Sequence, residues 1–434
     1  MLVAAEEPWE AQQVERQVTR RRQAVTEIWD LTNEVVLVGA GSRLPIPGRH
    51  DLTYPFHPHL EYLYLTDRER PGGVLAFDPT EGWVDFVTPV TRGERLWEGA
   101  AEGDAAGTTS IECLPSWVAR RNGRRLALLG APFEQAPPPD DALTAELRRG
   151  LNRVRRPKDE LELGRMRRAE RATAAGFASL LGLIEPGRTE RQLQIELEAE
   201  FFRHGADGVA FDTIVAGGPN AAVLHFPPSH RKLQAGELVL VDAGAEVRGY
   251  ASDITRTYPV SGELTAEQRA VYDVVARAGD ESIKRCLPGT EFREIHRGAQ
   301  LVLAEGLTDL GVLRGPPEDL VASEAVSVFF PHGIGHLVGL GIRDAGEVLP
   351  GRDRAEFPPL RVDLPLLPGY VTTIEPGIYF VPALVQDREL RAKHRGQVNW
   401  EKAEAMIGFG GVRIENNVLV TDDGFEVLTR DVPL

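Results

Sequence analysis

The stretch Val239–Thr257 reads VLVDAGAEVRGYASDITRT and places two aspartates, Asp242 and Asp253, on either side of a glycine-rich turn. β-Forming residues run into Asp242, and the β-branched Ile254 and Thr255 follow Asp253. Glycines between the two arms supply the backbone freedom for a hairpin or bulge. Such a hairpin brings both carboxylates to one point, where they repel each other unless a divalent cation lies between them. Taken alone, the pair is more typical of two turn aspartates, because Asp is a common turn residue.

Length, charge and cysteine content narrow the class of protein. The 434 residues are enough for two or three domains, and 42% of them are hydrophobic. The net charge of −16 argues against nucleic acid or an anionic membrane as a partner. Cys113 and Cys286 form no metal-binding spacing. No apolar run reaches the ~18 residues of a membrane span. The N-terminal stretch lacks a basic segment before an apolar run, so we expect no secretory signal and a cytoplasmic protein.

Alternating strand-like and helical segments predict an α/β domain over residues 1–157. Helical patterns occur at Glu10–Trp29 and near Ser116–Arg121. The predicted strands are Val35–Val38, LEYLYL at residues 60–65, GGVLAF, WVDFVTPV and RLALLG. No nucleotide-binding fingerprint or nucleophile elbow occurs here, so we expect a scaffold, an oligomerisation surface or a pocket wall. The stretch APPPDD and a basic segment then lead to a domain boundary near Pro157.

A faint internal repeat divides the second predicted domain, residues 158–434. PGRTERQLQIELEAEFFRHG begins at Pro186, and PGTEFREIHRGAQLVLAEGL begins at Pro288. Each copy has Pro-Gly, then an amphipathic helix with a glycine near its end. Thr189 and Gln192 form a capping-box pattern. The duplicated unit predicts a pseudo-symmetric domain with a site where the two halves meet.

Further polar side chains stand at strand ends or glycine turns of this domain: His225, His332 and His336 of HGIGH, Glu375, Arg413 and Glu415. Each alone is typical of a core histidine, a turn acid or an exposed strand face. Together with the two aspartates, Glu375, Glu415 and His336 supply four carboxylates and one imidazole, which match the charge of two divalent ions. This oxygen-rich set favours manganese first, then cobalt or zinc. Two metals close together can bridge and activate one water for attack on an acyl carbon.

The order and surroundings of these residues resemble the pita-bread metallopeptidases, the family of aminopeptidase P, prolidase and methionine aminopeptidase. The resemblance covers roughly Pro157–Leu434, and the segments FPPLRVDLPLLPGYVTTIEPGIYF and VNWEKAEAMIGFGGVRIENN resemble the prolidase branch most. It implies an α/β (α+β) protein in which an N-terminal α/β domain precedes a pseudo-symmetric pita-bread catalytic domain. The N-terminal domain tells against methionine aminopeptidase, which lacks one.

The resemblance also implies a ligand set. Asp242 would bind one metal, His336 and Glu375 would bind the other, and Asp253 and Glu415 would bridge them. Glu375 would in addition take the proton from the bridging water.

Five residues would act around this centre by the same resemblance. His225 would hydrogen-bond the substrate carbonyl, and His332 would line the proline pocket and assist proton transfer. Arg413 would fix a ligand carboxylate. Arg361 stands where the prolidase branch carries the arginine that reads the dipeptide's carboxylate, and Arg343 would help it.

Two departures from the family pattern stand out. Arg343 stands seven residues after the histidine ligand His336 (343 − 336), where the family usually has a second histidine. This replacement changes the chemistry beside the proline pocket. Asn416 and Asn417 replace an acidic residue that commonly follows the last ligand, which we expect to change only the surrounding charge.

The sequence therefore predicts a dinuclear metallopeptidase that cleaves Xaa-Pro dipeptides, a prolidase, with two divalent ions per chain. Aminopeptidase P, which acts on longer peptides with proline second, is the nearest alternative. An inactive peptide-binding module on the same fold is a further alternative, although all five ligands are present. Relatives with such an N-terminal domain are generally oligomeric, so we also expect a homodimer formed through it.

Overall fold

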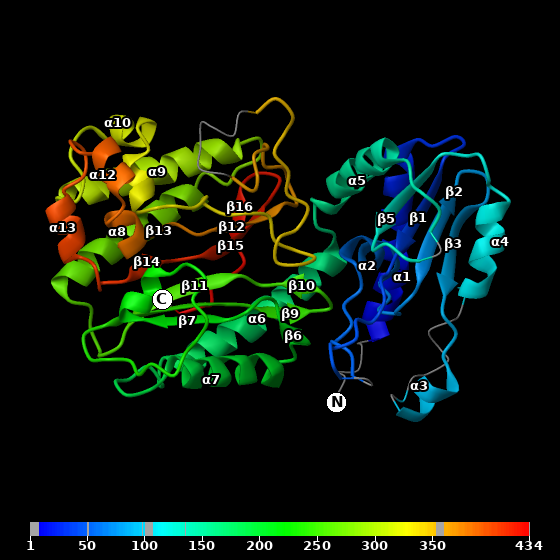
Figure 1. Cartoon of the computed structure of the whole chain (residues 1–434), viewed down its shortest axis with the longest axis horizontal. Coiled ribbons are helices and arrows are strands. Elements are labelled where there is room, and N and C mark those ends of the chain that lie inside the picture. Colours follow the sequence, from blue (N-terminus) through cyan, green and yellow to red (C-terminus); the bar gives the residue numbers. More distant parts are fainter. Residues whose placement is uncertain are drawn as a thin grey trace. The chain divides into compact units, whose positions relative to one another are not determined.

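The computed structural model describes residues 8–49, 52–97, 99, 107–134, 136–352 and 360–433. The chain divides into two units, Met1–Arg155 and Arg156–Leu434, and this division falls beside the boundary expected at Pro157. Figure 1 shows both units. None of the described helices has the length and apolar character needed to span a membrane.

The first unit is built on a five-stranded mixed sheet in the order β4-β3-β2-β1-β5. Its strands are β1 (Val35–Gly39), β2 (Val74–Asp78), β3 (Gly82–Val87), β4 (Thr109–Ser110) and β5 (Leu126–Gly130). Its helices are α1 (Pro8–Trp29), α2 (Leu60–Thr66), α3 (Arg92–Trp97), α4 (Leu114–Ala119) and α5 (Asp141–Arg155). β1 runs parallel to β5 and antiparallel to β2, so the expected α/β character is confirmed.

The prediction of a strand at LEYLYL is wrong, because these residues form the helix α2. The His59 side chain accepts a hydrogen bond from the Glu61 N–H and caps the helix. Tyr62 and Tyr64 are only 0% and 3% exposed, and Leu63 and Leu65 are also buried. Periodicity cannot separate a short buried helix from a buried strand, because both read as continuous apolar runs. These aromatic side chains therefore offer no exposed surface for the expected dimer, which stays a prediction.

Two helix pairs flank the strands of the second unit (Figure 1). α6 (Glu160–Leu180) packs on α7 (Glu190–Arg203), and α8 (Ala266–Ile283) packs on α9 (Phe292–Asp309). The capping box expected at Thr189 and Gln192 is present at the start of α7. The two helix pairs correspond to the two copies of the internal repeat.

The strands between the helix pairs form short antiparallel ladders. β7 (Ile214–Gly217), β8 (Leu238–Ala243) and β11 (Ile254–Pro259) make one sheet, while β12 (Val371–Ile374), β15 (Asn416–Val420) and β16 (Phe425–Val427) make another. The smaller ladders contain β6 (Gly208–Val209), β9 (Ala245–Val247), β10 (Tyr250–Ala251), β13 (Gly377–Tyr379) and β14 (Gly411–Arg413). Short helices complete the unit: α10 (Pro317–Ala322), α11 (Pro382–Val385), α12 (Arg388–Lys393) and α13 (Trp400–Ala405).

The predicted hairpin is present and sets the register of the two aspartates. Asp242 on β8 lies opposite Thr255 on β11, and Asp253 directly precedes β11. Between these strands, Arg248 and Gly249 turn the chain from β9 to β10 with φ of 53° and 80°. The backbone comes closest at Gly244, where a Cβ atom would lie 1.8 Å from the Ser252 carbonyl oxygen.

We expect Gly244→Ala to lower the free energy of unfolding by about 3 kcal/mol, because the clashing atom belongs to the backbone and cannot rotate away. Chemical denaturation of the metal-free protein measures this change. Gly164→Ala is the matched control: Gly164 lies in α6 with open space around it, so alanine there adds about 0.5–1 kcal/mol of stability. Equal stability of the two variants would contradict the close approach at Gly244.

Candidate active site

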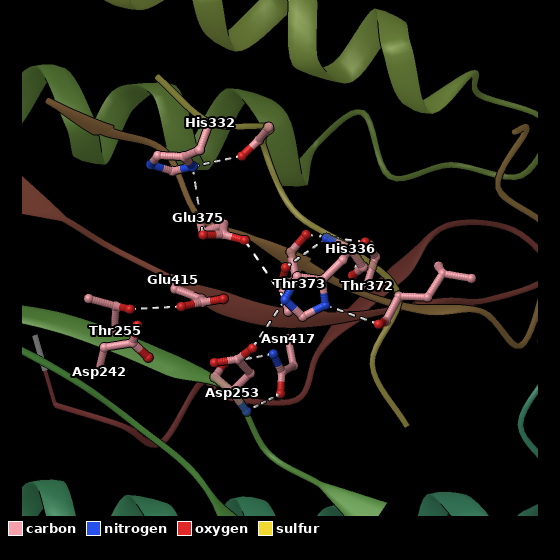
Figure 2. A network of polar contacts seen from close by, with 12 residues as sticks. Asp242, Asp253, Thr255, His332, His336, Thr372, Thr373, Glu375, Glu415 and Asn417 are labelled. Atoms are coloured by element: carbon pink, nitrogen blue, oxygen red, sulfur yellow. Dashed lines mark hydrogen bonds and ion pairs between the residues drawn. The ribbon is translucent and has the colours of Figure 1, made fainter. Parts of the chain in front are cut away.

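Five polar side chains from separate parts of the second unit converge on one space, as Figure 2 shows. Asp242 comes from β8, Asp253 from the start of β11, Glu375 from the end of β12 and Glu415 from the turn between β14 and β15, while His336 lies in a loop that bridges to β12. All five line a cavity of about 710 Å³. The structure therefore brings together the whole predicted ligand set.

Hydrogen bonds across the strands fix two of the carboxylates. The Thr255 hydroxyl donates to Glu415 Oε2 at 2.7 Å, and the Glu415 N–H donates to the Thr255 carbonyl at 3.0 Å. The Asn417 amide donates to the Asp253 carbonyl at 2.7 Å and accepts from the Asp253 N–H at 3.0 Å. Asn417 thus positions the Asp253 backbone. From the sequence we expected this asparagine only to change the charge around the site.

The HGIGH turn presents His336 to the carboxylates. A Cβ atom at Gly335 would lie 2.1 Å from the Thr373 carbonyl oxygen, so only glycine lets the turn pack this closely. His336 Nδ1 lies 3.0 Å from the Leu337 carbonyl, which can only accept, so Nδ1 carries the hydrogen. Nε2 then faces Asp253 Oδ2 at 3.4 Å and Glu375 Oε1 at 3.9 Å. Burial lowers the pKa of His336, which leaves the Nε2 lone pair available to a cation.

The carboxylates lie in a setting that disfavours their negative charge. Burial raises the pKa of Asp253 well above its ordinary value, and the neighbouring Asp242 and Glu375 carboxylates add to this rise. Burial and then Asp253 do the same to Glu415, and burial raises the pKa of Glu375. Asp242 Oδ1 is buried without a hydrogen-bond partner. Crowded carboxylates with an unused oxygen fit divalent cations, which would neutralise their repulsion.

Asp253, His336 and Glu415 meet the geometric requirement for a metal ion most closely. One donor atom of each lies within 4.8 Å of the others, and all three residues are buried. Asp242 and Glu375 line the same cavity and supply further oxygen donors. Four carboxylates and one imidazole form a set typical of manganese, cobalt or zinc.

Arg413 joins the cluster to a chain of hydrogen bonds. It is only 3% exposed, and it donates from Nη2 to Asp242 Oδ2 at 2.6 Å and from Nε to Thr255 Oγ1 at 3.0 Å. Its Nη1 donates to the Tyr379 hydroxyl oxygen at 2.9 Å, and this hydroxyl lies 2.9 Å from His332 Nε2. The expectation that Arg413 contacts a ligand carboxylate agrees with this geometry.

Tyr379 is the residue of this network that our reading of the sequence missed. It ends β13, four positions after Glu375 (379 − 375), within the stretch EPGIYF. A buried tyrosine hydroxyl needs a polar partner, and a tyrosine directly after a predicted ligand strand could have been singled out on this ground. Burial raises the pKa of Tyr379 to about 12, so the hydroxyl group stays protonated. It donates a hydrogen bond to His332.

The remaining predicted site residues divide into two groups. His332 lies beside Glu375, with Nδ1 3.8 Å from Glu375 Oε2 (Figure 2), and burial lowers its pKa to about 3. His225, Arg343 and Arg361 line the cavity. His332 and Arg413 are not among the described residues that line this cavity.

Comparison with known proteins identifies the family. Residues 164–422 match metallopeptidase family M24. The chain belongs to this family. A probable Xaa-Pro aminopeptidase of Botryotinia fuckeliana is 31% identical to this M24 chain. The match covers 88% of this chain and 86% of the fungal protein.

Solved structures give the same result. An aminopeptidase of Pseudomonas aeruginosa matches with a TM-score of 0.81 and 30% identity, over 96% of this chain and 95% of its own. Zinc-substituted aminopeptidase P of Escherichia coli, in complex with product, matches with a TM-score of 0.80 and 27% identity, over 96% and 95% of the two chains. The expected N-terminal domain and pita-bread catalytic domain of the M24 protein are thus confirmed. These relatives are aminopeptidases, which favours the alternative over the predicted dipeptidase.

We expect Mn²⁺ to raise the unfolding temperature of this M24 protein, because ions that bind only the folded state stabilise it. Asp253→Asn or Glu415→Gln should weaken Mn²⁺ binding at least about tenfold, since a neutral amide replaces a charged donor. Isothermal titration and thermal unfolding measure both effects. Asp309→Asn, at the exposed end of α9, removes the same charge and should change neither. Tight binding of Mn²⁺ to both cluster variants would remove these two residues from the ligand set.

Proposed function

We propose that this chain is a metal-dependent Xaa-Pro aminopeptidase, which removes the first residue from peptides that carry proline second. The observation that carries the proposal is the convergence of five metal-ligating side chains in one cavity. The names of the family relatives support aminopeptidase activity over the dipeptidase activity predicted from the sequence. Manganese as the metal, a homodimer and a cytoplasmic location stay predictions.

In this proposal Asp242, Asp253, His336, Glu375 and Glu415 hold two divalent ions. The crowded, buried carboxylates and the unpartnered Asp242 Oδ1 support that assignment. When bound, the ions would polarise the scissile carbonyl group and acidify water, which makes amide hydrolysis feasible near neutral pH.

Two side chains at the cavity would then act on the reacting atoms. Glu375 takes a proton from the attacking water, because burial raises the pKa of its carboxyl group towards that of a useful general base. His225 stands at the cavity surface and donates a hydrogen bond to the substrate carbonyl oxygen, which gains negative charge as the water adds.

Arg413 and Tyr379 act by positioning. Arg413 holds Asp242 Oδ2, and Tyr379 holds His332 in the orientation that places its ring beside Glu375. Because His332 Nδ1 also contacts the Gly333 carbonyl, its Nε2 accepts from Tyr379 and the ring has one fixed tautomer.

We expect Tyr379→Phe to lower kcat about tenfold or more while leaving bound metal unchanged, because it deletes the hydrogen bonds to Arg413 and His332 but no ligand. Steady-state kinetics with elemental analysis tests this split. Tyr258→Phe is the control, since it removes a buried hydroxyl that contacts only the Pro433 carbonyl among the described residues. A loss of metal in Tyr379→Phe would instead assign the tyrosine a structural role.

A dipeptidase is the second candidate because two cations line the cavity. Arg343 and Arg361 make no ion pair with any described residue, and partial burial followed by the nearby Arg343 cation lowers the pKa of Arg361. Two guanidinium groups that line one cavity suit a carboxylate, such as the C-terminus of a dipeptide.

A comparison of Ala-Pro with Ala-Pro-Ala separates the two candidates. An aminopeptidase has the higher kcat/KM for the tripeptide, loses activity on chelation and recovers it with Mn²⁺. The dipeptidase is correct if the protein prefers the dipeptide and Arg361→Gln lowers kcat/KM for the dipeptide by about ten- to hundredfold. The same variant should leave kcat/KM for the tripeptide nearly unchanged.

Arg343→His, which restores the usual family residue, should weaken that dipeptide preference only in part. Full activity after exhaustive chelation would refute both, and no hydrolysis of any Xaa-Pro peptide would leave the inactive binding module.

A further inference from the structure

A bulge interrupts the strands beside the metal-ligating cluster. Val209 on β6 pairs with Ala245, and Ile214 on β7 pairs with Asp242. Val209 and Ile214 are five positions apart in the chain (214 − 209), whereas their partners Asp242 and Ala245 are only three positions apart (245 − 242). The 209–214 segment therefore carries two extra residues that leave the ladder. Bulges of this kind re-aim side chains and occur next to active sites.

Three residues of the bulge line the cavity: Phe211, Asp212 and Thr213. Thr213 is 2% exposed, and its hydroxyl has no hydrogen-bond partner. Asp212 is exposed and makes no hydrogen bond or ion pair within the described parts of the chain. The hydroxyl lies beneath the cavity surface, so the polar group that this segment offers to a ligand is the Asp212 carboxylate.

The helix α7 supplies a second wall next to the bulge. It packs against β6 and β7, the strands on either side of the bulge. Arg191, Gln194 and Glu198 are spaced as one helical face and all line the cavity. Gln194 Nε2 donates to Glu198 Oε1 at 2.7 Å, whereas Glu198 Oε2 has no partner among the described residues.

The positive charge of Arg191 is already engaged on this wall. Its guanidinium group donates to the Gln194 side-chain oxygen and, from Nη2, to the Pro228 carbonyl at 2.9 Å. It forms no ion pair with Glu198 or with any other described carboxylate. Asp212 and Glu198 therefore line the cavity, and neither carboxylate has a cationic partner among the described residues.

We propose that the bulge and α7 form a subsite for the side chain of the substrate's first residue, and that it favours lysine or arginine there. The inference rests on the proposed aminopeptidase function. Val209 and Phe211 also line the cavity and suit the methylene stem of such a side chain, while Asp212 and Glu198 suit its charged end.

Strand geometry places the subsite within reach of the cleaved bond. Ile214 lies opposite Asp242, and Asp212 lies only two positions before Ile214, so at most about 7 Å of chain separates Asp212 from Ile214. An extended lysine side chain covers a similar length. Arg343 and Arg361 line the same cavity, so the arginines and the Asp212 wall give it both charge signs. A peptide with a cationic first residue and a free carboxylate matches this polarity.

The experiment compares Lys-Pro-Ala with norleucine-Pro-Ala, which has a stem of the same length without the charge. We expect the wild-type protein to have the higher kcat/KM for the lysine peptide. Asp212→Asn and Glu198→Gln should each reduce the ratio of the two kcat/KM values by about three- to tenfold, and higher ionic strength should reduce the wild-type ratio. Asp212→Lys should shift preference towards Glu-Pro-Ala.

Glu196→Gln is the matched control, because Glu196 lies exposed on α7 and does not line the cavity. Its ratio should equal that of the wild-type protein. Hydrolysis of both peptides with a ratio unchanged by Asp212→Asn and by Asp212→Lys would overturn the subsite and leave the aminopeptidase function standing. Absence of hydrolysis of every Xaa-Pro-Ala peptide by the Mn²⁺-loaded protein would overturn both.

Discussion

Four carboxylates crowd into one cavity, three of them buried, and their mutual repulsion is the constraint on which the rest of this unit depends. Burial and neighbouring charge raise the pKa of Asp253 and Glu415, so the ionised cluster is unfavourable until cations enter. The protein offsets part of this cost with one buried guanidinium, because Arg413 contacts Asp242 directly. A site of this kind is held open by the surrounding fold and is completed by its ions.

Rigid backbone contacts keep the cluster in place. Asn417 bonds the Asp253 backbone, Thr255 bonds Glu415, and glycines at positions 244 and 335 allow strands to approach where any side chain would clash. The ligands come from both halves of the pseudo-symmetric unit, so the cavity lies where the two halves meet. Preorganised donors of this kind are what a hydrolytic metal centre requires, since little rearrangement remains for the reaction itself.

The walls of the cavity differ in charge, and this difference bears on specificity. Among the described residues, Arg343 and Arg361 are cations that form no ion pair, and Asp212 and Glu198 are carboxylates without cationic partners. In the proposed function, the reaction type depends on the central cluster and the choice of peptide depends on these wall residues.

The sequence by itself determined the family, and it predicted the five residues that cluster in the cavity, because aspartates, glutamates and histidines next to glycine turns carry their chemistry in the local pattern. It predicted a strand at residues 60–65, where burial on all sides produced a helix. Only the tertiary structure decided that Tyr379 joins Arg413 to His332, that Asn417 positions Asp253, and that Asp212 and Thr213 bulge into the cavity. Those contacts join residues far apart in the chain, and strand register, which sets them, depends on packing between elements that no local pattern contains.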